Sequence, residues 1–319
     1  MKKFVFLALC VLIAMAGTLW ARGNQGGGAR AGYQIALITM DSMDEHWLRL
    51  NAGAQDRARE LREAGTQVWV DWGAPVIGKV DAAEQLRLIE DAITRRVDAI
   101  MLAPLHADAL VPGINRAHAA GIKVILVDSG ASTENWDAFL FTDNAAAARL
   151  AADEMARAIN GQGQVAIINA QAGAGTTMIR ENEFKAQMAA RYPGITIVGT
   201  QYSDGDAQRA LNQATDFMTA NPNLAGIYAC NEGSSVGVGN AIQQRNAAGR
   251  VRFVGFDFSA TLKTFIENGV MNATMIQNPY QMGYQGVDAA VNLIQGRATE
   301  RRVDTGVTVG TRANIATIN

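Results

Sequence analysis

Short apolar runs alternate with longer amphipathic segments along most of the chain. In the first such pair, an apolar run at residues 35–38 precedes a polar loop at 39–45. Beyond the loop, apolar or small residues recur every three to four positions, which places them on one face of a helix. They are Trp47, Leu50, Ala54, Ala58 and Leu61. We therefore predict a buried strand, a loop and a crossover helix that reaches Ala64 and ends at Gly65.

The alternation continues at a spacing of about 25 to 35 residues, which is typical of βαβ units. The further predicted strands are 67–72, 99–103, 123–127, 139–142, 164–169, 195–200, 224–230, 251–256 and 272–277, with a short terminal strand region at 303–309. The predicted helices are 81–95, one ending at 120, 144–160, 178–192, 206–221, 234–244, 260–268 and 280–295. So many strands favour an α/β protein with two parallel-sheet domains over a single sheet.

The N-terminus has a different composition from the rest of the 319 residues. Lys2 and Lys3 precede an apolar stretch at 4–16, and small residues follow up to Ala21. This pattern predicts a secretory signal peptide at residues 1–21, followed by a Gly-rich leader at 22–32. Later segments contain no run of 18 apolar residues, so we expect an exported protein without a membrane segment.

Charge and cysteine content exclude several classes of protein. Without Lys2 and Lys3, 26 basic residues stand against 30 acidic ones, a net charge of −4. This balance does not favour binding to nucleic acid or to an anionic membrane surface. Cys230 is the one cysteine beyond the signal peptide, and its apolar surroundings indicate a core residue rather than a nucleophile.

Polar residues that suit hydroxyl groups stand at the ends of several predicted strands. They are Asp44, Asp128, Asn231, Asp257 and Gln277. Each of them alone is equally well explained as a cap of the following helix or turn. Because ligands of open α/β sheets bind at the carboxyl ends of the strands, five such residues together favour a polar pocket.

Motifs for catalysis, cofactors and metals are incomplete. Residues 233–237 match G-x-S-x-G, but this hydrolase motif requires a histidine after the serine, and His46, His106 and His118 all precede it. We interpret the match as a helix start with a serine cap. Residues 173–175 resemble a dinucleotide loop without its third glycine or its acid, which indicates a turn. No His or Cys cluster has metal-ligand spacing, so neither cofactor nor metal is expected.

Together, these segments resemble the ribose- and galactose-binding type of periplasmic sugar-binding proteins, the receptors of ABC importers. The resemblance covers about residues 34–319 and is carried by IALITMDSMDEHWLRLNAGA, VDAIMLAP, GIKVILVDSG, GTTMIRENEF, IYACNEGSSVGVGNAI, FVGFDFSATL and ATMIQNPYQMGYQGV. It implies two Rossmann-like, doubly wound domains joined by a three-strand hinge. The implied lobes are residues 33–142 with 278–304, and residues 143–277 with 305–319.

The resemblance also implies a set of ligand-binding residues. They are Asp44, His46, Trp47, Asp128, Ser129, Arg180, Asn231, Asp257 and Gln277. Ribose binders differ at four of the corresponding positions, where this chain has Asp44 for Asn, His46 for Phe, Ser129 for Arg and Gly205 for an aromatic residue. These departures argue against ribose itself but are compatible with another pentose, a hexose or a polyol.

We therefore expect a monomeric, non-enzymatic periplasmic protein that binds a neutral sugar between two lobes and delivers it to an ABC permease. The alternatives are a receptor for a furanosyl signal or a chemotaxis partner, a sugar-responsive transcription regulator and a secreted α/β hydrolase. The predicted signal peptide and the absence of a helix-turn-helix before Gln34 argue against the regulator. The missing histidine argues against the hydrolase.

Overall fold

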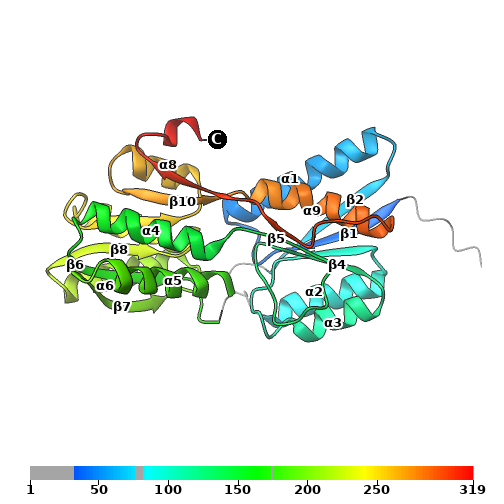
Figure 1. Ribbon diagram of the computed structural model, residues 1–319, viewed down its shortest axis with the longest axis horizontal. Helices are drawn as coiled ribbons and strands as arrows, with labels where there is room; N and C mark the ends of the chain where they lie inside the picture. The colour runs from blue at the N-terminus through cyan, green and yellow to red at the C-terminus, as the bar shows by residue number, and fades with distance from the viewer. Residues whose placement is uncertain (1–31, 76–81, 174, 319) are drawn as a thin grey trace, which may run out of the picture. The chain divides into compact units, whose positions relative to one another are not determined.

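The computed structural model describes residues 32–75, 82–173 and 175–318. These residues form two six-stranded sheets with helices on both faces, which confirms the predicted α/β fold of two doubly wound domains (Figure 1). The predicted signal peptide and the predicted leader up to residue 31 lie outside the described residues. None of the helices in the described ranges has the length and apolar character needed to cross a bilayer.

The first sheet has the strand order β2-β1-β3-β4-β5-β11, and all of its neighbouring strands are parallel. Its strands are β1 (Tyr33–Ile38), β2 (Val68–Gly73), β3 (Ala99–Leu102), β4 (Lys123–Val127), β5 (Ala138–Phe141) and β11 (Arg302–Asp304). Its helices are α1 (Glu45–Glu63), α2 (Ala82–Arg95), α3 (Val111–Ala119) and α9 (Pro279–Ile294). We call this sheet and its helices the first lobe.

The second sheet repeats this topology in the order β7-β6-β8-β9-β10-β12. Its strands are β6 (Gly163–Asn169), β7 (Ile195–Tyr202), β8 (Leu224–Ala229), β9 (Arg252–Phe256), β10 (Ala273–Gln277) and β12 (Val307–Thr311). Its helices are α4 (Asn144–Ala158), α5 (Gly175–Arg191), α6 (Ala207–Ala220), α7 (Glu232–Gln244) and α8 (Ala260–Glu267), with the short 3₁₀ helix η1 (Ile315–Thr317) near the C-terminus. We call this sheet and its helices the second lobe.

Both faces of the central strands are buried, which explains why these strands are continuous apolar runs. Helices α1 and α9 cover one face of the first sheet, and α2 and α3 cover the other (Figure 1). In β1, Ile35 and Leu37 pack against α1 and α9, while Ala36 and Ile38 pack against α2 and α3. Successive side chains of a strand point to opposite faces, so one short run supplies both cores.

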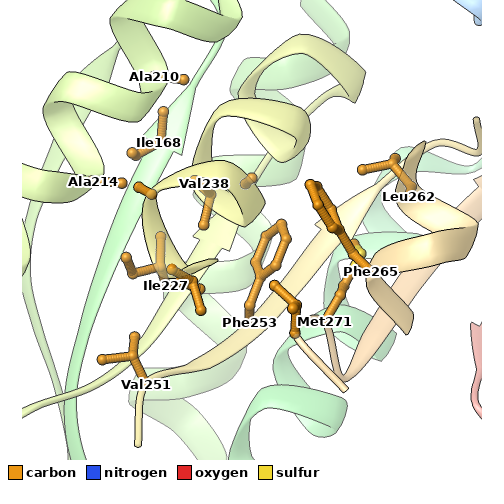
Figure 2. Close-up of a cluster of buried hydrophobic side chains, with 14 of the residues drawn as sticks. Ile168, Ala210, Ala214, Ile227, Val238, Val251, Phe253, Leu262, Phe265 and Met271 are labelled. Carbon is orange, nitrogen blue, oxygen red and sulfur yellow. The ribbon is translucent and has the colours of Figure 1, made fainter. Parts of the chain in front are cut away.

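The second lobe is built in the same way. Ile168 of β6 and Ile227 of β8 belong to a cluster with side chains of α6, α7 and α8, which Figure 2 shows around Phe253 and Phe265. Their strand neighbours face α4 and α5, where Tyr228 stacks on Phe184 with ring centroids 4.0 Å apart. The two layers of helices hold the strand ends, and therefore the loops that follow them, in fixed positions.

The terminal strand region predicted at 303–309 consists of two strands, one in each sheet. β11 pairs with β5 in the first sheet, whereas β12 pairs with β10 in the second sheet and is the one antiparallel strand among those described. The break falls at Thr305–Gly306, where Gly306 has a φ of 82°, a conformation that favours glycine. The chain also passes between the sheets after β5 and after β10.

Helices α1 and α9 lie unusually close together because each presents a glycine to the other. A Cβ atom on Gly283 would lie 1.9 Å from the Leu50 carbonyl oxygen, and one on Gly53 would lie 2.0 Å from that of Tyr280. We expect Gly283→Ala to lower the free energy of unfolding by about 2–3 kcal/mol, since the helices must separate. Chemical denaturation followed by circular dichroism measures this loss.

Gly73→Ala is the matched control for this substitution. A Cβ atom at Gly73 would meet only the Leu88 side chain, at an ordinary 3.5 Å. Its effect should therefore stay below about 1 kcal/mol. Equal losses in the two variants would contradict the close helix contact.

Candidate ligand-binding site

The predicted ligand-binding residues come from both lobes, at the ends of strands and in the helices that follow. Asp44, His46 and Trp47 lie at the start of α1, and Asp128 and Ser129 follow β4. In the second lobe, Arg180 lies in α5, Asn231 precedes α7, Asp257 follows β9 and Gln277 ends β10. The structure brings His46, Asp128, Asp257 and Gln277 into one buried cluster, and Arg180 and Ser129 flank it.

Asp128 and Asp257 occupy equivalent positions in the two lobes. Each follows a central strand, and their φ angles are 62° and 75°. This left-handed conformation is uncommon for residues other than glycine, although aspartate tolerates it better than most. Their backbone N–H groups donate to Leu140 and Met275 across the sheets, at 2.8 and 2.9 Å. The cross-strand hydrogen bonds hold both residues in this strained form, a feature common at functional sites.

His46 connects these two carboxyl groups. Its Nε2 lies 3.1 Å from Asp128 Oδ1, and its Nδ1 lies 3.6 Å from Asp257 Oδ1. Burial alone would lower the pKa of His46, but the hydrogen bond to Asp128 and the charges of both aspartates raise it to about 9. The imidazole is therefore a cation at neutral pH, with a donor on each ring nitrogen for one carboxylate of each lobe.

Arg180 supplies the second buried cation. It is 2% exposed, and its guanidinium carbon lies 4.0 Å from the centroid of the Phe256 ring. Nε donates to Asn144 Oδ1 at 2.7 Å, and Nη1 donates to the Cys230 carbonyl oxygen at 2.8 Å. These contacts use two of the five N–H donors of the guanidinium and fix its plane near Asp128, whose pKa its charge lowers.

The remaining predicted residues have more varied environments. Gln277 donates through Nε2 to Asp257 Oδ1 at 2.7 Å, and its Oε1 is buried without a partner among the described residues. Ser129 donates to Asp128 Oδ2 at 2.8 Å. Asn231 Oδ1 accepts from the Ser234 N–H at 3.3 Å and thus caps α7. Trp47 is 6% exposed in the core of the first lobe, with its ring edge-to-face against His46.

Glu232 belongs to this cluster, although it was not among the predicted residues. Its Oε2 accepts from the His46 backbone N–H at 3.1 Å, and its Oε1 accepts from that of Glu45 at 3.4 Å. An acid of the second lobe thereby caps a helix of the first lobe, a role that the side chain of Asp44 does not perform. In the sequence, Glu232 is indistinguishable from an acid that favours the start of its own helix.

Two acids near His46 are hard to ionise. Burial, together with the charges of Asp41, Glu232 and Asp257, raises the pKa of Asp44 to about 8. Burial and the charge of Asp257 raise the pKa of Glu232 to about 7. In contrast, hydrogen bonds and the charges of His46 and Arg180 outweigh burial and lower the pKa of Asp128. At neutral pH, the cluster therefore contains both ionised and protonated acids.

We expect the protein without a ligand to lose stability as the pH rises from 5 to 9. Folding raises the pKa values of Glu232, Asp44 and His46 from 4.5, 3.8 and 6.5 to about 7, 8 and 9. Each group therefore stabilises the folded protein at low pH, and this contribution is lost as the pH rises from the lower value to the higher one. Because folding lowers the pKa of Asp128, its contribution to stability changes only below the ordinary pKa of 3.8. Melting temperatures should fall by roughly 5 °C across this range.

The Glu232→Gln variant should flatten the part of this curve between pH 5 and pH 7. Glu267→Gln, at an exposed position of α8, should leave the curve unchanged. A melting temperature that is constant or rises from pH 5 to pH 9 would contradict the raised pKa values.

The predicted serine cap of the helix at residues 233–237 is wrong. Helix α7 begins at Glu232, so its cap is Asn231 rather than a serine. Ser235 is buried, with its Oγ bound to the backbone of Phe256. This hydroxyl stabilises the end of a strand and is not exposed as a nucleophile.

Two doubly wound lobes that share one buried polar cluster define the class of type I periplasmic sugar-binding proteins. A family model described as "Periplasmic binding protein domain" matches residues 35–298, so the chain belongs to this family. Its members are non-enzymatic sugar-binding proteins that serve ABC transporters.

Relatives with known ligands support the same class. The chain is 30% identical to the D-allose-binding periplasmic protein of Escherichia coli K12, over 83% of this chain and 85% of that protein. It is 27% identical to the ribose import binding protein of Salmonella typhimurium, over 95% of this chain and 96% of that protein. A solute-binding protein of Agrobacterium vitis with bound D-fucose has a TM-score of 0.85 and 36% identity, covering 89% of this chain and 97% of the other.

Proposed function

We propose that this protein is exported, captures a neutral monosaccharide or polyol between its lobes and delivers it to the permease of an ABC transporter. The observation that carries the proposal is the meeting of Asp128 and Asp257, one from each lobe, at His46. The predicted signal peptide at residues 1–21 supports export, and we expect a monomer that docks on the permease in its closed form.

The chemistry of the cluster suits a hydroxylated ligand. A sugar hydroxyl both donates and accepts, so it can give its proton to Asp128 or Asp257 and accept one from Arg180. Gln277 Oε1, which has no partner among the residues that the structure describes, is a further acceptor for a hydroxyl donor. Each charge-assisted hydrogen bond in a closed, dry site contributes about 1.5–3 kcal/mol. Binding through donors and acceptors from both lobes would stabilise the closed arrangement.

This chain differs from ribose binders at positions that we expect to contact the ligand. Ser129 and Gly205 stand where ribose binders carry an arginine and an aromatic side chain, and His46 replaces a phenylalanine. Smaller side chains at two of these positions favour a ligand other than ribose. The sugars named for the relatives, D-allose, D-fucose and D-arabinose, are therefore the first candidates.

A thermal-shift screen tests the proposal. The panel contains D-ribose, D-allose, D-fucose, D-arabinose, xylitol and a furanosyl signal molecule, and calorimetry of any hit gives its Kd. A sugar or polyol should raise the melting temperature and be recovered unchanged. A shift with the furanosyl signal alone would favour the receptor alternative, and no shift with any compound would contradict the proposal.

A further inference from the structure

A cavity of about 390 Å³ opens next to the ligand-binding cluster. It is lined by the loop after β4, by the segment that connects β5 to α4, and by the start of α5. Both lobes therefore contribute to its wall. Its volume lies within the usual range of small-molecule sites.

The cavity shares residues with the cluster. Asp128 lines the cavity and contacts His46 at 3.1 Å. Asn144, which also lines it, accepts from Arg180, and Thr176 Oγ1 lies 3.5 Å from Ser129 Oγ. A ligand held by Asp128 and Arg180 would thus have one side directed toward this space.

Part of the cavity wall is aromatic. Phe139 stacks on Phe141 with ring centroids 4.9 Å apart, and Trp136 contacts Phe139 edge-to-face at 6.1 Å. Ile179 adds an aliphatic side chain that is 45% exposed, which is unusual for isoleucine on a helix of this protein. Arg302 also lines the cavity, with its guanidinium carbon 5.0 Å from the centroid of the Phe141 ring and 5.3 Å from that of Phe139. Such a wall suits a ring that has an apolar face and a polar edge.

Two further features indicate that the space is suited to a ligand. Small residues line much of it, namely Ala107, Gly130, Ala131, Ala145 and Gly175. The hydroxyl of Thr142, which is 1% exposed and lines the cavity, has no hydrogen-bond partner in the part of the chain that the structure describes. Buried polar groups normally have partners, so this hydroxyl is available to one polar atom of a ligand.

We propose that the ligand is a glycoside, whose sugar occupies the cluster at Asp128 and Arg180 and whose second ring occupies the aromatic cavity. This inference rests on the proposed function and extends it from monosaccharides to molecules with two rings. The second ring is either another pyranose, whose C–H face packs on Phe141, or an aryl group. Both have the same flat, apolar face, and the Thr142 hydroxyl reaches one polar atom at their edge.

Calorimetry with matched ligands tests the inference. Each sugar of the screen is compared as the free sugar, the methyl glycoside, the phenyl glycoside and the non-reducing unit of a disaccharide. We expect the phenyl glycoside or the disaccharide to bind at least tenfold more tightly than the methyl glycoside. Only these two ligands have a second ring to bury in the cavity. Which of the two binds more tightly identifies the second ring.

Two variants locate the second ring. Ala145→Phe should remove this gain by filling the cavity, while Ala146→Phe, the next residue along α4 and not part of the wall, should retain it. Ile179→Ser reduces the apolar wall at an exposed position and should lower the gain severalfold with little effect on folding.

The outcomes separate the two proposals. If free sugars bind but the two-ring ligands bind no more tightly than the methyl glycosides, the inference is overturned while the proposed function stands. A gain that persists in both Ala145→Phe and Ile179→Ser also overturns it. If no sugar binds in any form, both proposals fail.

Discussion

Replacing Arg180 by alanine is expected to weaken sugar binding by at least about a hundredfold. The guanidinium is buried at 2% exposure and is oriented by Asn144, Cys230 and Phe256, so its remaining N–H groups can donate to a ligand without reorganisation. Loss of two charge-assisted hydrogen bonds costs about 3 kcal/mol or more, which corresponds to this factor. Calorimetry and the sugar-induced thermal shift both report the loss.

Two further variants show whether the effect belongs to the guanidinium. Arg180→Lys keeps the charge but not the planar fork and should recover only part of the affinity. Arg250→Ala, at an exposed position, should bind the sugar like the unmodified protein. Circular dichroism of each variant establishes that the fold is retained. An unchanged Kd in folded Arg180→Ala would remove Arg180 from the site.

Asp257→Asn is expected to weaken sugar binding by roughly thirtyfold or more. The substitution keeps the shape of the side chain and a residue type that tolerates the φ of 75°. It removes the negative charge of the carboxylate, whose Oδ1 accepts from Gln277 Nε2 at 2.7 Å and lies 3.6 Å from His46 Nδ1. Because an amide has one uncharged acceptor oxygen where the carboxylate has two charged ones, the side chain accepts fewer and weaker hydrogen bonds from sugar hydroxyls.

The same substitution should shift the titration of its neighbours. Without the charge of Asp257, the pKa of Glu232 should fall and that of His46 should fall as well, since this charge raises both. NMR titration of the His46 ring follows the second change. Asp216→Asn, on the exposed face of α6, is the control. Native affinity in Asp257→Asn, together with an unshifted His46, would contradict the bridge between the lobes.

Much of the fold is predictable because its signals are local. The run at Ile35–Ile38 is buried on both faces, and the residues spaced along α1 form the core that the spacing predicts. The terminal strands are different. Their assignment to separate sheets depends on pairing β11 with β5 and β12 with β10, contacts that join distant parts of the chain. No local pattern encodes such pairing.

The site was predictable to the extent that it follows strand ends. Asp128, Asp257 and Gln277 end strands of parallel sheets, and the structure places them together. Asn231 shows the limit of this reasoning, because it caps α7 while standing at a strand end. Whether a strand-end residue caps a helix, contacts a ligand or does both depends on its side-chain torsions, which the sequence does not specify.

Contacts between the lobes were beyond the reach of sequence patterns. Glu232 accepts from the backbone of α1, and His46 lies between two aspartates that belong to different sheets. Trp69 is 46% exposed because β2 is an edge strand and one of its faces is open to solvent. These features depend on how segments that are distant in the sequence pack against one another.

The most direct test of the account is a crystal structure of the protein with the sugar that gives the largest thermal shift. We predict that the sugar lies between the lobes and is chemically unchanged. Its hydroxyls should lie within hydrogen-bond distance of Asp128, Arg180 and Asp257. A sugar bound on the outer surface of either lobe, or a chemically altered product at this position, would contradict the account.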